Sequence, residues 1–219
     1  MITLEDVIKN EEVQAFVNAS QKQLEALGYT EHSNRHIGIV SKRTGEILQK
    51  LGFSERTIEL GKIAGYLHDI GNCVNRIDHA HTGAILAYNI LKEMGMAANE
   101  RTEIMMAIGN HDERTGTAVS DISAALILAD KSDAHRSRVS KSDRGLFDKH
   151  DEVNYAVTHS ELKVDVQERK VKLILTIDTN ICPVIDYFEI FMERTKMSKR
   201  AAKYLGLWFE LVINDTNLL

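Results

Sequence analysis

Apolar residues recur at helical spacing through most of the first 135 positions of the chain. An N-terminal helix should open at a capping box of Thr3 and Asp6 and end at Gly28. Only one proline, Pro183, is present, so the strongest helix breaker is almost missing. We therefore expect a mainly α fold, with further helices over about 31–51, 54–68, 79–94, 99–109 and 122–138.

The pattern changes in the last third of the chain. Apolar and polar residues alternate over 162–166 and over 171–177, which predicts a small β-hairpin. Helical spacing returns after Pro183, and it predicts two further helices, the second capped by Ser198 and carrying Trp208. The charge-dense segment 131–151 is typical of a solvated loop, with a lid over a substrate as the alternative. We expect residues 1–150 to form one domain, with residues 151–219 packed on it as one structural unit.

Charge and cysteine content narrow the function classes. The formal net charge of −5 argues against general nucleic-acid binding, which needs many Lys and Arg residues, but allows a small anionic ligand. Cys73 and Cys182 lie far apart, so they predict neither a disulfide framework nor a thiolate zinc site, and a reducing cytoplasm fits best. No apolar run approaches the roughly 20 residues of a membrane span, so we expect neither a membrane anchor nor a signal peptide.

The dipeptide His-Asp occurs three times, and its context separates one copy from the others. His68-Asp69 closes the apolar stretch 63–67, where an ionisable pair is costly unless it is paired or bound to metal. The preceding helix begins near His36, and a short turn at Gly52 should make the two helices antiparallel. His36 and His68 are therefore expected to meet.

Three more candidate ligands lie at or near helix ends. His79 begins one predicted helix, His111 follows another, and Asp130 lies among apolar residues of a third. His36, His68, Asp69 and Asp130 can bind one divalent cation, while Asp69 can bridge to a second one held by His79 and His111. Such ions would activate water for hydrolysis, and Fe, Mn, Zn, Mg and Ni all suit ligands of this kind.

These residues resemble the HD superfamily of metal-dependent phosphohydrolases, whose signature is a His, then His-Asp, then a distant Asp. The stretch "HIGIVSKRTGEILQKLGFSERTIELGKIAGYLHDIG" is similar to the start of the HD-GYP type, and "HAHTGA" and "NHDER" resemble its later His-containing steps at His79 and His111. The resemblance implies an HD-domain helical bundle with an extended, two-metal site. Asp112 stands where that group has a second His, and the Gly-Tyr-Pro tripeptide is absent after Gly116. Both departures favour a relative that hydrolyses nucleotides or dinucleoside polyphosphates over one that cleaves cyclic dinucleotides.

The residues expected to bind the substrate are the cations that follow Asp130 in the sequence. Lys131, Arg136 and Arg138 suit the binding of phosphate oxygens, and Asp69 and Lys131 are the expected catalytic residues. His32 is a candidate for contacting the substrate or for orienting a metal ligand, and Asp112 is either a metal ligand or an orienting group.

The expected partner is a small phosphorylated molecule such as a nucleotide, with no nucleic acid and no membrane, and the aromatic C-terminal helix could serve a homodimer. Two rival functions stay open at this point: a diiron oxygenase on the same scaffold, and a nucleotide sensor without catalysis.

Overall fold

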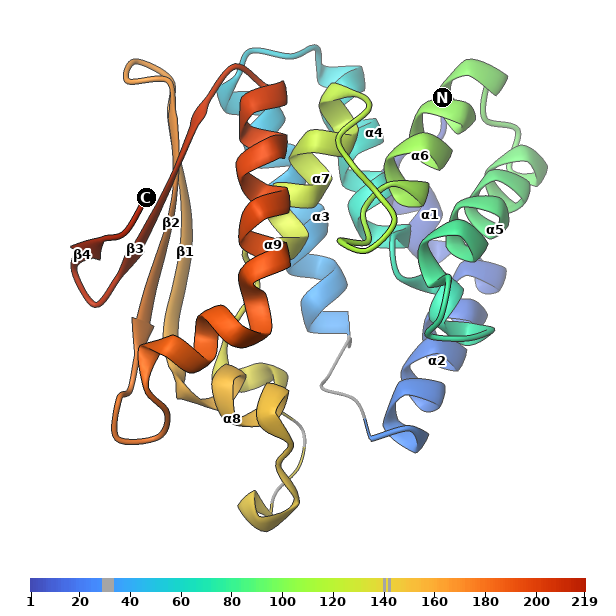
Figure 1. The fold of residues 1–219 in the computed structure, drawn as a ribbon. Helices are drawn as coiled ribbons and strands as arrows, with labels where there is room; N and C mark the ends of the chain where they lie inside the picture. Colours follow the sequence, from blue (N-terminus) through green and yellow to red (C-terminus); the bar gives the residue numbers. More distant parts are fainter. Residues whose placement is uncertain (29–33, 140, 142) are drawn as a thin grey trace.

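The computed structural model describes residues 1–28, 34–139, 141 and 143–219. The described part is mainly helical and carries a small sheet near its C-terminal end (Figure 1). The α-helices are α1 (Leu4–Lys9), α2 (Glu11–Ala26), α3 (Asn34–Lys50), α4 (Glu55–Leu67), α5 (His79–Glu93), α6 (Ala98–Gly109), α7 (Asp121–Lys131), α8 (Lys149–Ala156) and α9 (Val184–Tyr204). Short 3₁₀ helices cover η1 (Ile70–Cys73), η2 (Arg136–Arg138) and η3 (Arg144–Leu146), and the strands are β1 (Val157–Asp165), β2 (Lys170–Ile177), β3 (Trp208–Ile213) and β4 (Thr216–Asn217).

Helix α7 is the centre of the helical part. It contacts α3, α4, α6 and α9, and every residue from Ile122 to Lys131 is buried. A helix covered on all sides is usually apolar throughout, and α7 is apolar from Ala124 to Ala129, before its last two residues, Asp130 and Lys131. Two charged side chains at the buried end of a core helix need partners close by, and this places the chemistry of the fold at that end.

Helices α3 and α4 form the antiparallel pair that the sequence predicts. The Ser54 side chain accepts a hydrogen bond from the Thr57 N–H and caps α4. The helices approach so closely that a Cβ at Gly65 would lie 2.7 Å from the Cα of Ser41. This close packing brings the first turn of α3 beside the last turn of α4, as expected for His36 and His68.

The sheet has the strand order β1-β2-β3-β4 and is larger than the predicted hairpin. β1 and β2 are antiparallel with Leu162 opposite Leu173, which confirms the hairpin. β2 and β3 are parallel with Leu173 opposite Leu211, and the short β4 returns antiparallel to β3. Figure 1 shows α9 standing between this sheet and α7, and α9 contacts α7, β2 and β3.

The two helices predicted after Pro183 lie end to end within α9, on either side of a kink at Phe191, where the backbone angles are non-helical. The predicted start of the second one is wrong, because Ser198 is a buried interior residue and not a cap, and α9 ends at Tyr204. Trp208 lies in β3, where alternate side chains are buried and paired against β2. The apolar spacing here matches both a helix and a strand, and Gly206, with φ of +71°, ends α9 just before it.

The segment after α7 also differs from the prediction. The expected helix over 122–138 ends at Lys131, and η2 is a separate turn in which the His135 side chain accepts from the Ser137 N–H. The first part of the charge-dense segment is packed, since Asp133 and Arg138 are buried, whereas most of 143–150 is exposed as predicted. No helix within the described residues is long and apolar enough to cross a membrane. The domain division at residue 150 stays a prediction.

Candidate metal centre

Six buried side chains converge at the end of α7, and each comes from a helix terminus or close to one. His36 lies in the first turn of α3, His68 caps α4, and Asp69 precedes η1. His79 is the first residue of α5, His111 follows the C-cap of α6, and Asp130 is the penultimate residue of α7. All six are less than 9% exposed. The sequence-predicted ligand set is therefore brought together in one place.

In three of the four histidines, Nδ1, the ring nitrogen that points away from the centre, contacts a main-chain carbonyl oxygen. Nδ1 of His68 lies 2.9 Å from the carbonyl oxygen of Gly65, and Nδ1 of His79 lies 3.1 Å from that of Arg76. Nδ1 of His111 is held in the same way by a carbonyl oxygen three residues earlier, at 2.6 Å. Because a carbonyl oxygen only accepts, each Nδ1 must donate, and each neutral ring keeps its lone pair on Nε2.

His36 is held by a carboxylate instead. Its Nδ1 lies 2.7 Å from Oδ2 of Asp133, a side chain only 1% exposed. Arg35 and Arg138 contact the same carboxylate, and these cations together with His36 hold the pKa of Asp133 well below its usual range, against the opposing effect of burial. A carboxylate behind an imidazole is the usual outer partner of a metal-binding histidine.

The inner nitrogens and two carboxylates form a first group. Nε2 of His36 lies 3.3 Å from Oδ1 of Asp130, and Nε2 of His68 lies 3.8 Å from the same oxygen. Oδ2 of Asp69 lies 3.4 Å from Nε2 of His68 and 3.9 Å from Nε2 of His36. Burial alone would lower the pKa of His68, but the carboxylates of Asp69 and Asp130 outweigh burial and raise it.

A second group lies on the other side of Asp69. Nε2 of His79 is 3.2 Å from Nε2 of His111, and Oδ1 of Asp69 is 3.4 Å from the former and 3.8 Å from the latter. Asn72 donates to Oδ1 of Asp69 at 3.0 Å and so orients the carboxylate. Burial, helped by His111 and Arg76, lowers the pKa of His79 to about 4, so this ring is neutral at physiological pH.

These donor sets fit divalent cations. Nε2 of His79 and Nε2 of His111 lie 3.2 Å apart, and two nitrogens on one zinc-like ion are about 2.9–3.4 Å apart. Nη1 of Arg76 lies 3.2 Å from Nε2 of His79 and donates to it in this structure, so this donor would have to give way to a cation. Nε2 of His68 is buried and has no hydrogen-bond partner among the described residues, although it faces the two carboxylates. Two sets of three ligand atoms lie within 4.8 Å of one another: His36, His68 and Asp130, and His68, Asp69 and His111.

Asp112, which the sequence left open as ligand or orienting group, lies behind His79. Its Oδ2 is 3.6 Å from Nδ1 of His79, on the side away from the inner nitrogens. The backbone and side chain of Arg114 donate to it and lower its pKa against the effect of burial. This position matches the orienting alternative.

A small cavity beside the second group is rimmed by cations. Nζ of Lys131 lies 2.7 Å from Asp130 and 2.7 Å from Glu113, and Nε of Arg194 on α9 lies 3.5 Å from Glu113. Burial alone would lower the pKa of Lys131, but the two carboxylates outweigh it and raise the pKa, so the ammonium stays charged. The lining residues are Asp69, Arg76, His79, His111, Glu113, Asp130, Lys131 and Arg194.

Residues 35–141 match the family model of the HD domain. An uncharacterized protein of Methanocaldococcus jannaschii is 31% identical over 157 residues, which are 61% of this chain and 60% of that protein. The chain thus matches only 60% of the length of this relative. The crystal structure of a predicted HD superfamily hydrolase from an uncultured Thermotogales bacterium is 25% identical and covers 61% of this chain and 75% of that one, with a TM-score of 0.45.

The HD-domain match contains His36, the His68-Asp69 pair and Asp130, and thus confirms the resemblance at the level of the HD domain. The closer resemblance to the HD-GYP or dinucleoside-polyphosphate type stays a prediction. Arg194 lies outside the match and enters the cavity from the C-terminal helix. No spacing in the sequence links it to the ligand set, and the same holds for Arg76, Asn72 and Glu113.

Two of the expected phosphate-binding cations lie elsewhere. Arg138 is 2% exposed and donates from Nη1 to the carbonyl oxygen of Asp133, behind His36. The guanidinium of Arg136 lies over the ring of Tyr155 at 5.3 Å. Neither is among the described residues that line the cavity, because α7 ends before them and the chain turns away. The candidate His32 falls outside the described residues.

Proposed function

We propose that the protein is a metal-dependent phosphohydrolase that cleaves a phosphate ester or anhydride of a nucleotide or a similar small molecule. One observation carries the proposal. The two oxygens of Asp69 face different histidine groups, Oδ1 toward His79 and His111 and Oδ2 toward His36 and His68. A carboxylate between two sets of imidazole lone pairs is the arrangement that a pair of divalent cations requires. The HD-domain match over residues 35–141 supports the same class of enzyme.

The residues would divide between two ions. His36, His68 and Asp130 would hold one, His79 and His111 the other, with Asp69 between them. Divalent cations at such sites act as Lewis acids and lower the pKa of water from 15.7 toward about 7, so no Ser or Cys nucleophile is required. The chain contributes by holding Nδ1 of each histidine, so the four rings are oriented before an ion binds.

The cations of the cavity would bind the phosphate. Lys131 is charged and buried beside Asp130, and Arg194 approaches from α9. Glu113 contacts both cations and neutralises part of their charge, with its own pKa held well below the usual range by Lys131 and Arg194 against burial. Phosphate oxygens could take the place of this carboxylate on Arg194, which has a planar fork suited to them.

The test compares the wild type with Asp69→Asn, and uses Asp78→Asn as a matched control. Asp78 is an exposed carboxylate with positive φ, a conformation that Asn tolerates, so the control removes a charge without touching the site. Metal content of gently purified protein would be measured by elemental mass spectrometry, and phosphate release from a panel of nucleotides on the same samples.

We expect about two equivalents of metal and phosphate release in the wild type and the control, and loss of both in Asp69→Asn. Tight nucleotide binding by metal-loaded protein without turnover would instead identify a sensor. Oxygen consumption in place of phosphate release would identify a diiron oxygenase.

A further inference from the structure

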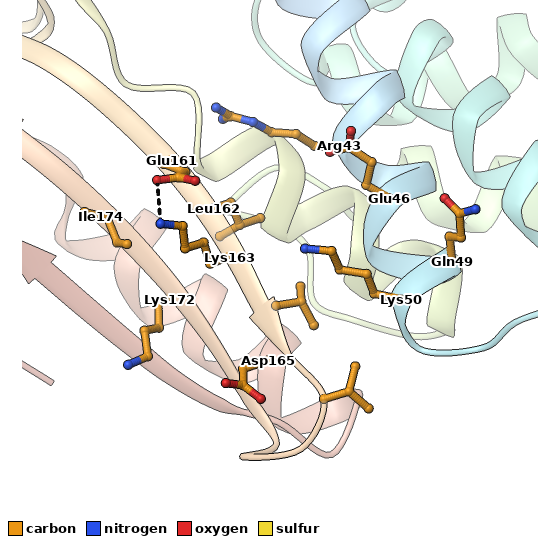
Figure 2. A pocket seen from close by; sticks show the side chains of 12 residues that line it. Arg43, Glu46, Gln49, Lys50, Glu161, Leu162, Lys163, Asp165, Lys172 and Ile174 are labelled. Atoms are coloured by element: carbon orange, nitrogen blue, oxygen red, sulfur yellow. Dashed lines mark ion pairs between the residues drawn. The ribbon is translucent and has the colours of Figure 1, made fainter.

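A hollow of about 1000 Å³ lies beside one edge of the sheet, away from the metal centre (Figure 2). One wall is the exposed side of α3, with Arg43, Glu46 and Lys50. The other wall is β1 from Glu161 to Asp165, the terminal strand of the sheet, together with Val166 and with Lys172 and Ile174 of β2. The hollow therefore includes the outer edge of β1, the longest strand among the described residues, and part of the adjoining face of the hairpin.

The backbone of β1 offers unpaired groups to this hollow. The Ser160 carbonyl oxygen accepts a hydrogen bond from Nη2 of Arg43 at 2.9 Å, so the backbone of Ser160 faces away from β2. Successive residues of a strand alternate between its two edges, so Leu162 and Val164 present their N–H and C=O groups on the same outer edge. Such an edge is a template for another strand.

The charges along β1 are complementary to those of a second, antiparallel copy of β1. Glu161, Lys163 and Asp165 alternate in sign on one face, and Nζ of Lys163 lies 3.0 Å from Glu161, as the dashed line in Figure 2 marks. An antiparallel copy of the same strand, centred on Leu162, puts Glu161 of each copy opposite Lys163 of the other. It also puts His159 opposite Asp165. Opposite charges directly across a strand pair stabilise it.

We propose that the protein forms a homodimer in which β1 pairs with β1 of a second copy, antiparallel, with the two-fold axis at Leu162. The four-stranded sheet would become a continuous eight-stranded sheet across the axis. Leu162 would face its equivalent as a hydrogen-bonded pair, because its backbone groups lie on the outer edge.

Other registers fit less well. Centring the pair on Lys163 places lysine opposite lysine and Glu161 opposite Asp165. Centring it on Val164 moves the partner strand onto residues 166–169, which form the turn and not a strand. Centring it on Ser160 places Val164 opposite Ala156, the last residue of α8 and not part of a strand. Like charges or a missing strand weaken these alternatives, whereas in the register centred on Leu162 the Ser160 carbonyl oxygen, which has two lone pairs, can keep Arg43 and accept from Val164 as well.

The opposite edge of the sheet is protected, which favours a closed dimer over a chain of copies. β4 covers the end of β3 at Val212 and Ile213, and the Leu218 N–H donates to the Leu211 carbonyl oxygen. Short strands and returning chain are common devices that block further pairing. β1 has neither, although Arg43 of α3 contacts its edge at Ser160, and its alternating charges restrict its partners.

The test uses two charge reversals that cancel when mixed. Glu161→Lys makes both positions positive and Lys163→Glu makes both negative, so either homodimer would oppose like charges twice. Each reversal should weaken self-association by about ten- to a hundredfold. In a mixture, each Lys of one variant faces a Glu of the other, and a heterodimer should form with wild-type affinity. Lys9→Glu on α1, an exposed residue paired with Glu5, is the matched control.

Sedimentation over a dilution series gives the mass of each sample. The wild type and Lys9→Glu should show twice the chain mass of 24.7 kDa, each reversal alone should show the single chain, and the mixture should show the doubled mass again. A monomeric wild type, an open series of larger species, or a dimer that neither reversal weakens would overturn the proposal. Circular dichroism of each variant establishes that a lost dimer is not a lost fold.

Discussion

Lys131→Met tests whether the buried ammonium at the metal centre stabilises the fold by balancing the negative charge of the carboxylates around it. The Lys131 side chain is 5% exposed, and its Nζ lies 2.7 Å from Asp130 and 2.7 Å from Glu113. Removing one partner of a buried ion pair costs about 3–5 kcal/mol because the other charge remains without compensation. In the variant, Glu113 still has Arg194 as a partner at 3.5 Å and is partly exposed. The loss in the free energy of unfolding should therefore lie at the lower end of this range, about 3 kcal/mol.

Metal should reverse part of this loss, because Asp130 would then face a divalent cation through its other oxygen. Urea unfolding in the presence of a chelator should show the full loss of about 3 kcal/mol in the free energy of unfolding of Lys131→Met relative to the wild type. With saturating Mn²⁺ the difference should shrink by roughly 1–3 kcal/mol, the size of one such charge interaction near a protein surface. Lys42→Met, which removes an exposed lysine paired with Glu46 at 3.6 Å, should stay within about 0.5 kcal/mol in both conditions. The same loss with and without metal, or a loss below about 1 kcal/mol in chelator, would refute the reasoning.

Three further predictions concern the surroundings of the site and the fold. Gly71→Ala should cost more than about 4 kcal/mol in chemical unfolding, because the new Cβ would lie 2.0 Å from the carbonyl oxygen of His79; near-wild-type stability would contradict the close packing of η1 on α5. Arg194→Met should keep its metal but lose about ten- to a hundredfold in kcat/KM for phosphate release, and an unchanged value would exclude Arg194 from phosphate binding. The Arg56 side chain holds the pKa of Glu100 below its ordinary value, so its contribution is present above the unfolded pKa of about 4.3 and disappears as the pH falls through the lower folded value. Arg56→Met should therefore cost about 1 kcal/mol at neutral pH, and the gap from wild type should close in acid unfolding experiments.

The ligand set could be predicted from the sequence because each residue is anchored to a helix end. Caps and glycines locate helix ends, and antiparallel neighbours bring alternate ends together, so His36, His68 and His79 follow from local signals. The apolar run before Asp130 likewise reveals a buried helix. Local patterns of this kind are therefore sufficient to predict most of the candidate metal ligands.

What escaped the sequence depends on contacts between distant segments. Arg194 meets Glu113 only because α9 packs on α7, and nothing in either segment encodes that pairing. The strand at Trp208 escaped for another reason, since its apolar positions fit two periods and only pairing with β2 decides between them. The contact of Asp133 with His36 escaped because His36 lies far away in the sequence, at the start of α3.

His36 differs from the other three histidines in how the fold holds it, and this difference has consequences for how substitution can alter the centre. His68, His79 and His111 donate from Nδ1 to main-chain oxygens within their own turns, so no side-chain replacement elsewhere removes those partners. His36 depends instead on the Asp133 carboxylate, which is shared with arginines from two segments. The side of the centre that contains His79 and His111 is thus built by the backbone. The side that contains His36 is built by a side-chain network, and tuning of the metal affinity by substitution is expected to act there.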